Sequence, residues 1–174
     1  MQTVEDIPKD AILGGLPWDW EDYGGYLNSI EKLDLGINVA GMVGHTAVRY
    51  YVMGERSVEE LATDEEIQQM AEIVGDSMDG GAVGFSTNRY PPHVGPDGRS
   101  IPGTYAEAKE LLEIAKVVGQ KKGLMQNVLD FGGQPEFSFN LLKDLASTTG
   151  DRILFSIGAG PDPESGERVR NLLK

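Results

Sequence analysis

The sequence contains no cysteine, which excludes disulfide bonds, thiolate nucleophiles and cysteine-ligated metal ions together. It also lacks an apolar run of the about 18 residues that a transmembrane helix needs. The first residues, Met1 to Asp6, are acidic where a signal peptide would be basic and then apolar. We therefore expect a cytoplasmic protein that has no membrane partner.

Basic residues are scarce as well: 15 Lys and Arg stand against 28 Asp and Glu, which gives a net charge of −13. Such a chain repels phosphate backbones, so we expect no nucleic-acid partner. The sequence has no His-x-His pair, no His-Glu-x-x-His, no Gly-x-Ser-x-Gly and no Walker loop. A nucleotide-binding domain is disfavoured, because no phosphate-binding loop follows the first apolar run.

What is present is typical of a globular domain. Hydrophobic residues make up 40% and charged residues 25% of the 174 residues. This length predicts a single domain over residues 1–174. It is shorter than the about 250 residues that a closed eight-stranded (β/α) barrel usually needs.

Short apolar runs alternate with amphipathic helical segments along the chain. Two helices begin with a capping box, Thr63 with Glu66 and Thr104 with Glu107, and a third begins at Pro135. The alternation predicts an α/β fold with parallel strands and right-handed crossovers, either as a doubly wound sheet or as part of a barrel. The expected strands are 36–43, 82–85, 124–129 and 153–157, and the expected helices are 26–33, 63–78, 104–118, 135–145 and 169–173.

In parallel α/β folds, functional residues lie in the loops that follow the strands. His45 follows the first strand and could bind a metal, act as a base or donate to a substrate carbonyl; alternatively it shapes the loop. Arg49 could clamp a carboxylate with its guanidinium fork or form an ordinary ion pair. The four loops begin at Gly44, Ser86, Asp130 and Gly158.

The loop after the second strand is the longest and carries Arg89, Tyr90, His93 and Arg99, which are donors suited to an anionic ligand. Its alternative interpretation is a solvated surface flap. Because the carboxyl ends of consecutive parallel strands lie side by side, we expect the residues just beyond them to share one cleft. The predicted substrate-binding residues are His45, Arg49, Ser86, Thr87, Arg89 and Tyr90; we predict no catalytic residue and no metal ligand within the chain.

Several stretches occur together in the order found in one known family. Through them the sequence, from residue 1 to about residue 125, resembles the D-aminoacylase and N-acyl-D-amino-acid deacylase branch of the amidohydrolase superfamily (amidohydrolase family 3). The stretches are Val4–Pro8, Leu16–Glu21, Asn38–His45 with Arg49 and Val52–Gly54, Gly81–Thr87, and Asp97–Thr104.

This resemblance implies a partial TIM (β/α)8 barrel of about four consecutive βα units, which belongs to a longer parent. It implies a zinc site in the parent that activates water against the amide carbonyl of a small N-acyl amino acid. A His-x-His pair, a bridging ligand and an aspartate of that site are expected outside this chain. The family's histidines on the fifth and sixth strands correspond to positions near Gln126–Asn127 and Ser156–Gly158, where this sequence has none.

Two functions follow as alternatives. The leading one is a metal-dependent hydrolase of carbon–nitrogen bonds, for which the isolated chain would be inactive because it lacks the first ligand pair. The other is a barrel relative that has lost catalysis and serves as a binding or assembly module, which the missing histidines favour. In either case a partial barrel has open sheet edges, so we expect exposed apolar surface and self-association.

Overall fold

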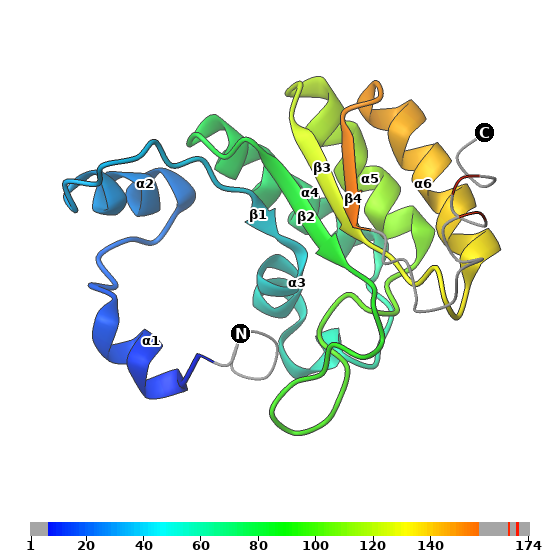
Figure 1. The fold of residues 1–174 in the computed structure, drawn as a ribbon, viewed down its shortest axis with the longest axis horizontal. Coiled ribbons are helices and arrows are strands. Elements are labelled where there is room, and N and C mark those ends of the chain that lie inside the picture. The colour runs from blue at the N-terminus through cyan, green and yellow to red at the C-terminus, as the bar shows by residue number, and fades with distance from the viewer. Residues whose placement is uncertain (1–6, 157–166, 168–169, 171–174) are drawn as a thin grey trace.

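The computed structural model describes residues 7–156 together with Glu167 and Arg170. Its four strands form one parallel sheet in the order β1-β2-β3-β4 (Figure 1). Each strand pairs with the next one in the sequence, without the reversal of strand order that marks a doubly wound sheet. The arrangement is that of four consecutive strands of a (β/α) barrel. The strands are β1 (Val43–Gly44), β2 (Gly84–Asn88), β3 (Leu124–Val128) and β4 (Ile153–Ser156).

Helices α4, α5 and α6 cover one face of the sheet, whereas no helix of the described part of the chain covers the other face (Figure 1). The first two helices stand apart from the sheet, beyond β1. No helix in the described residues is long and apolar enough to cross a membrane. The helices are α1 (Lys9–Gly15), α2 (Tyr23–Glu31), α3 (His45–Met53), the 3-10 helix η1 (Gly54–Ser57), α4 (Asp64–Asp79), α5 (Ala108–Gln120) and α6 (Pro135–Thr149).

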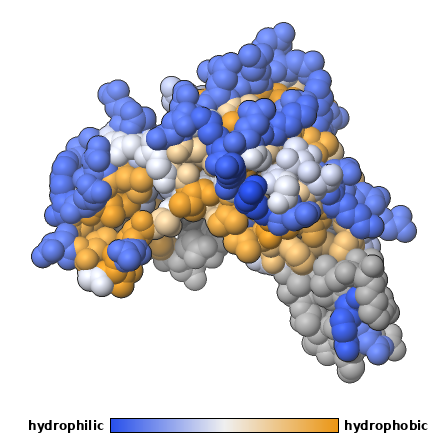
Figure 2. All heavy atoms as spheres, turned by 90° about the horizontal axis from the view of Figure 1, so that it is seen from above, coloured by the Kyte–Doolittle hydropathy of each residue, from blue (hydrophilic) through white to orange (hydrophobic). Residues whose placement is uncertain are grey.

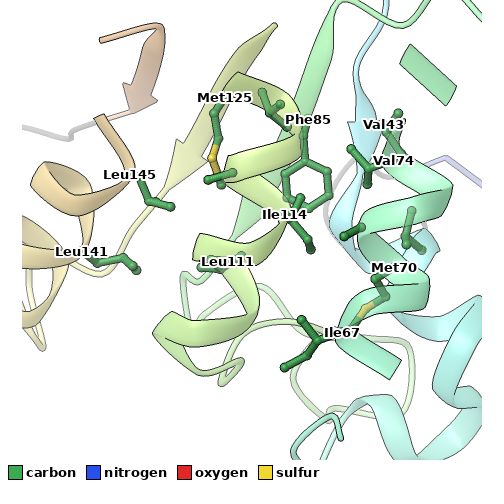
Figure 3. Packing of buried hydrophobic residues seen from close by; sticks show 14 of the residues in the cluster. Val43, Ile67, Met70, Val74, Phe85, Leu111, Ile114, Met125, Leu141 and Leu145 are labelled. Carbon is green, nitrogen blue, oxygen red and sulfur yellow. The ribbon is translucent and has the colours of Figure 1, made fainter. Parts of the chain in front are cut away.

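The hydrophobic core lies between the sheet and these covering helices (Figure 3). Phe85 of β2 and Met125 of β3 are paired in register and fully buried, and they pack with Leu111 and Ile114 of α5. Burying each such side chain contributes about 1.5–3 kcal/mol. Because side chains alternate along a strand, the residues next to Phe85 and Met125 point to the helix-free face.

Two strands differ from their expected positions. Residues 36–43 were predicted as a strand, but only Val43–Gly44 is paired in β1. Within the described residues this segment has no strand on its outer side, so Ile37 and Val39 remain exposed. Strand β2 begins two residues later than predicted and extends to Asn88, because its pairing with β3 continues through the polar residues.

The first capping box is confirmed. The Thr63 hydroxyl accepts from the Glu66 N–H at 3.2 Å, and the Glu66 carboxylate accepts from the Thr63 N–H at 2.8 Å. The second capping box is wrong, because α5 begins at Ala108 with Glu107 as its N-cap. The hydroxyl of Thr104 donates instead to the carbonyl of Ile101 at 2.9 Å and closes a turn in the preceding loop.

Three further elements can be compared with the sequence. Helix α6 begins with Pro135 as predicted, and Gly150 ends it in the left-handed conformation, with φ 69° and ψ 47°. Helix α3 occupies residues for which the sequence predicts a loop after Gly44. The predicted loop at 158–162 lies outside the described residues, and of the predicted helix at 169–173 only Arg170 is described, in helical conformation.

Candidate functional site

Helix α3 begins at His45, directly after β1, with Gly44 as its N-cap. Its buried residues His45, Val48, Arg49 and Met53 are spaced by three, one and four positions and therefore occupy one face. Helical spacing thus carries two polar side chains, an imidazole and a guanidinium, into the protein interior at the carboxyl edge of the sheet.

A buried carboxylate from another helix meets the His45 imidazole. The Nε2 atom of His45 lies 2.7 Å from Oε1 of Glu110, in the first turn of α5. Since an ionised carboxylate only accepts hydrogen bonds, Nε2 carries the proton and donates it. The other ring nitrogen, Nδ1, lies 2.9 Å from Oγ1 of Thr87 in β2, whose hydroxyl donates to it when the imidazole is neutral.

Arg49 uses all three of its guanidinium nitrogens inside the protein. Nη1 donates to the second oxygen of Glu110, Nε donates to the carbonyl of Ser57 at 2.9 Å, and Nη2 donates to the carbonyl of Glu60 at 2.6 Å. Its side chain is only 2% exposed. Of the two roles considered from the sequence, this geometry is that of an ion pair.

Burial and the neighbouring charges shift the pKa values of His45 and Glu110 in opposite directions. Burial lowers the pKa of the His45 imidazole, although the neighbouring Glu110 carboxylate opposes the shift. Burial alone would raise the pKa of the Glu110 carboxyl, but the hydrogen bonds and charges of His45 and Arg49 outweigh it and lower the pKa. At neutral pH the network therefore holds an ionised Glu110 and a neutral His45.

The order carboxylate, imidazole, hydroxyl is the order of a nucleophilic triad. Thr87, however, is only 2% exposed and His45 only 1%, so no substrate atom reaches the hydroxyl in this structure. Gly103 seals the network further, because a Cβ atom at this position would lie 2.6 Å from Nδ1 of His45. The arrangement therefore joins α3, β2 and α5 and does not present a nucleophile.

Arg89 lies just beyond β2 and is partly buried. Its Nη1 donates to the carbonyl of Ala106, and its guanidinium carbon lies 5.2 Å from the centre of the Phe137 ring in α6. Burial lowers the pKa of the Arg89 guanidinium, and the nearby Arg49 adds to this effect. Arg89 borders a small hollow together with Pro91, Thr104, Tyr105, Asp130, Gln134, Phe137 and Ser138.

Ser86 and Tyr90 do not join the buried network. Ser86 alternates with Thr87 along β2 and therefore points to the helix-free face, where it is partly exposed. Tyr90 is exposed, its backbone N–H donates to Oδ1 of Asn88 at 3.0 Å, and its ring meets that of His93 edge-on at 5.2 Å. A hydrogen bond also joins the side chains of Asn88 and His93.

All six predicted residues therefore lie at or just beyond the carboxyl ends of β1 and β2. The structure joins three of them, His45, Arg49 and Thr87, through Glu110, and Arg89 lies near enough to interact electrostatically with Glu110. Glu110 was missed from the sequence. The sequence feature that could have identified it is a charged residue on the otherwise apolar, buried face of α5, which consists of Glu110, Leu111, Ile114, Ala115 and Val118.

The described residues do not fit a metal site. No group of three or more His, Cys, Asp or Glu within them could hold a metal ion. The His45 ring has partners on both nitrogens, and the His93 Nδ1 atom is paired with Asn88. On the helix-free face, register aligns Ser86 with Gln126 of β3 and Leu154 of β4, and none of these is a typical metal ligand.

No protein-family model matches the chain. Among curated proteins, it is 29% identical over 117 residues to a D-aminoacylase from Alcaligenes xylosoxydans xylosoxydans. The aligned region covers 67% of this chain and 22% of the relative. It is 31% identical over 115 residues to an N-acyl-D-glutamate deacylase from the same organism, and this aligned region covers 66% of the chain and 21% of the relative. The chain thus spans about a fifth of the length of these relatives.

Solved structures show the same fold. The chain superposes on the N-acyl-D-glutamate deacylase from Bordetella bronchiseptica, solved with zinc and a phosphonate inhibitor, with a TM-score of 0.73 and 26% identity. This match covers 94% of the chain and 32% of the solved one. A D-aminoacylase structure matches with a TM-score of 0.71 at 22% identity, over 86% of this chain and 30% of that one. These likenesses confirm the partial barrel.

Proposed function

We propose that a protein containing this chain hydrolyses the amide bond of an N-acyl-D-amino acid. The chain is a relative of the D-aminoacylases and N-acyl-D-amino-acid deacylases and spans part of their length. The observation that carries this proposal is the likeness to a D-aminoacylase over 67% of the chain. We further propose that such a protein acts in the cytoplasm.

A divalent metal ion belongs to the same proposal. The similar deacylase from Bordetella bronchiseptica was solved with zinc, and a solved D-aminoacylase was studied for its binuclear metal centre. Since the described residues offer no cluster of three ligands, we propose that zinc is held mostly by residues outside this chain. The described part of the chain would then supply the carboxyl edge of the barrel next to the metal.

We propose that Ser86, Arg89 and Tyr90 contact the substrate, because these three side chains are partly or well exposed at that edge. His45, Arg49 and Thr87 are almost completely buried, so we propose that they contribute to substrate binding by fixing the ends of β1 and β2.

The test compares two proteins. A longer, zinc-loaded protein that contains this chain should release free amino acid from N-acetyl-D-amino acids, and a chelator should abolish the release. The isolated 174-residue chain should show no turnover in zinc. Turnover by the isolated chain would contradict the placement of the metal ligands outside it.

A second candidate is a barrel relative without catalysis, which binds the same small molecules or assists assembly. The absence of a metal-ligand cluster from the described residues favours it. Binding of N-acyl amino acids without turnover by the longer, metal-loaded protein would select this alternative. A His-x-His pair encoded upstream of Met1 would support the enzyme.

A further inference from the structure

Arg89 is a partly buried cation that forms no ion pair within the described residues. Its contacts there are a hydrogen bond to the carbonyl of Ala106 and the face of the Phe137 ring. By contrast, Arg49, Arg56 and Arg99 each pair with at least one carboxylate. In a chain with 28 acidic residues, a partly buried arginine without such a partner is unexpected.

The charges of the cluster formed by Arg49, Arg89 and Glu110 do not cancel. Two guanidinium groups, Arg49 and Arg89, act on a single carboxylate, Glu110, and this carboxylate is already hydrogen-bonded to Arg49 and His45. With His45 neutral, the cluster carries one excess positive charge although the whole chain is strongly acidic. Since burying an uncompensated charge is costly, an anion beside Arg89 would stabilise the cluster.

Part of the Arg89 guanidinium fork has no hydrogen-bond partner among the described residues, and Arg89 borders the hollow. Nη1 is used by Ala106, whereas Nε and Nη2 have no hydrogen-bond partner among the described residues. Asp130 also borders the hollow, but its carboxylate accepts the N–H of Gly133 at 2.8 Å and forms no ion pair with Arg89. Adjacent Nε and Nη2 donors match the two oxygens of a carboxylate.

We propose that Arg89 forms a carboxylate subsite, which takes the α-carboxylate of an N-acyl amino acid in the hollow between the loop after β2 and the start of α6. Arg49, the other arginine considered for this role, has every nitrogen engaged inside the protein. The identity of the carboxylate rests on the proposed function. The subsite itself rests on the unpaired cation and its free donors.

The direct test follows the Arg89 Nε–H signal of the 174-residue chain by nitrogen-15 NMR. N-acetyl-D-leucine should shift this signal saturably, whereas N-acetyl-D-leucinamide, which lacks the carboxylate, should not. Measured from the shifts of backbone amide signals, which every variant retains, the R89Q substitution should weaken the affinity for the acid about tenfold or more, since a charge-assisted contact is lost. R89K should weaken it less, because it keeps the charge but not the planar fork.

The matched control is R152Q. Arg152 is exposed, lacks a carboxylate partner in the described residues and donates to the carbonyl of Thr149 at 3.2 Å, so its loss should leave the affinity unchanged. The proposal is overturned by an amide that shifts Arg89 as the acid does, by no saturable shift, or by R89Q binding as tightly as wild type. Amide spectra of each variant establish that it is folded, and the wild-type titration requires no substitution.

The result also separates the subsite from the proposed function. Acid binding at Arg89 without turnover in the longer protein would keep the subsite and remove the deacylase. Turnover with an unchanged KM in R89Q would keep the deacylase and remove the subsite.

Discussion

Glu110 holds two buried side chains at once, since one carboxylate oxygen accepts from His45 and the other from Arg49. Replacing it by glutamine removes the charge and leaves Arg49 buried without a counter-ion. We expect E110Q to lower the free energy of unfolding by about 3–5 kcal/mol, as loss of one partner of a buried ion pair does. Urea unfolding followed by circular dichroism measures this change.

Glu113 provides the matched control, one helical turn further along α5. Its carboxylate forms an exposed ion pair with Lys116 at 2.6 Å. E113Q should cost less than about 1 kcal/mol, because solvent screens such pairs. Equal losses for E110Q and E113Q would show that the buried network contributes no more than a surface pair.

For single residues, the sequence predicted that six side chains lie at the carboxyl edge of the sheet, but it did not predict their hydrogen-bond partners. His45, Arg49 and Thr87 were named because they follow strands, and the structure places them at that edge. Glu110 was missed because an acidic residue in a chain of net charge −13 is expected on the surface. Only its position on the apolar face of α5 distinguished it.

Gly103 couples the long loop after β2 to the buried network. Its φ is +96°, and a Cβ atom there would lie 2.6 Å from the His45 ring. Gly98, in the same loop, has a φ of +80°, but a Cβ atom added to it would meet no heavy atom within 4 Å. G98A should therefore cost only the backbone strain, about 1–2 kcal/mol.

G103A should cost clearly more than G98A, because His45 is held at both ring nitrogens and cannot turn aside. Thermal unfolding of the two variants measures the difference. If both lose the same stability, the contact between the loop and His45 is softer than the structure indicates.

Whether a helix began where the sequence predicted depended on the hydrogen bond that the capping hydroxyl forms. Thr63 caps α4 as predicted, because its hydroxyl accepts the N–H of Glu66. Thr104 has the same sequence pattern, but the carbonyl of Ile101 takes its hydroxyl, so α5 begins later. Helix α3 lacks a side-chain cap, and two of its buried residues are polar, so neither start signal nor apolar periodicity revealed it.

In the described residues no helix covers one face of the sheet, and no further strand lies beside its two outer strands, β1 and β4. Exposed apolar side chains occur near both ends of the sheet order: Ile37, in the segment that precedes β1, is 76% exposed, and Leu154 in β4 is 49% exposed. Figure 2 shows hydrophobic residues gathered along one side of the molecule. We expect the 174-residue chain to associate as its concentration rises.

Sedimentation velocity over a range of concentrations tests this expectation. L154K should reduce association, because it places a charge on the helix-free face of an edge strand. L61K is the control, since Leu61 is 55% exposed but lies in the loop before α4. A monomer at every concentration, without binding of a dye for apolar surfaces, would favour a complete small α/β fold.

At the scale of the molecule, alternation of strands and helices predicted parallel strands but left a doubly wound sheet and a barrel equally open. Strand order separates the two, and it depends on how crossovers stack, which periodicity does not encode. The chain-order sheet and the likeness to solved deacylases resolve the choice.

The same strand order has a consequence for how the chain acquires its structure. Each strand pairs with the one made just before it. The connections are α3, η1 and α4 between β1 and β2, a loop and α5 between β2 and β3, and α6 between β3 and β4, so no pairing waits for a segment beyond the next βα unit. Pairing of segments that are near in the sequence costs less loop-closure entropy than pairing of distant ones. During synthesis the sheet can therefore grow one strand at a time, with each new βα unit adding to an edge that already exists.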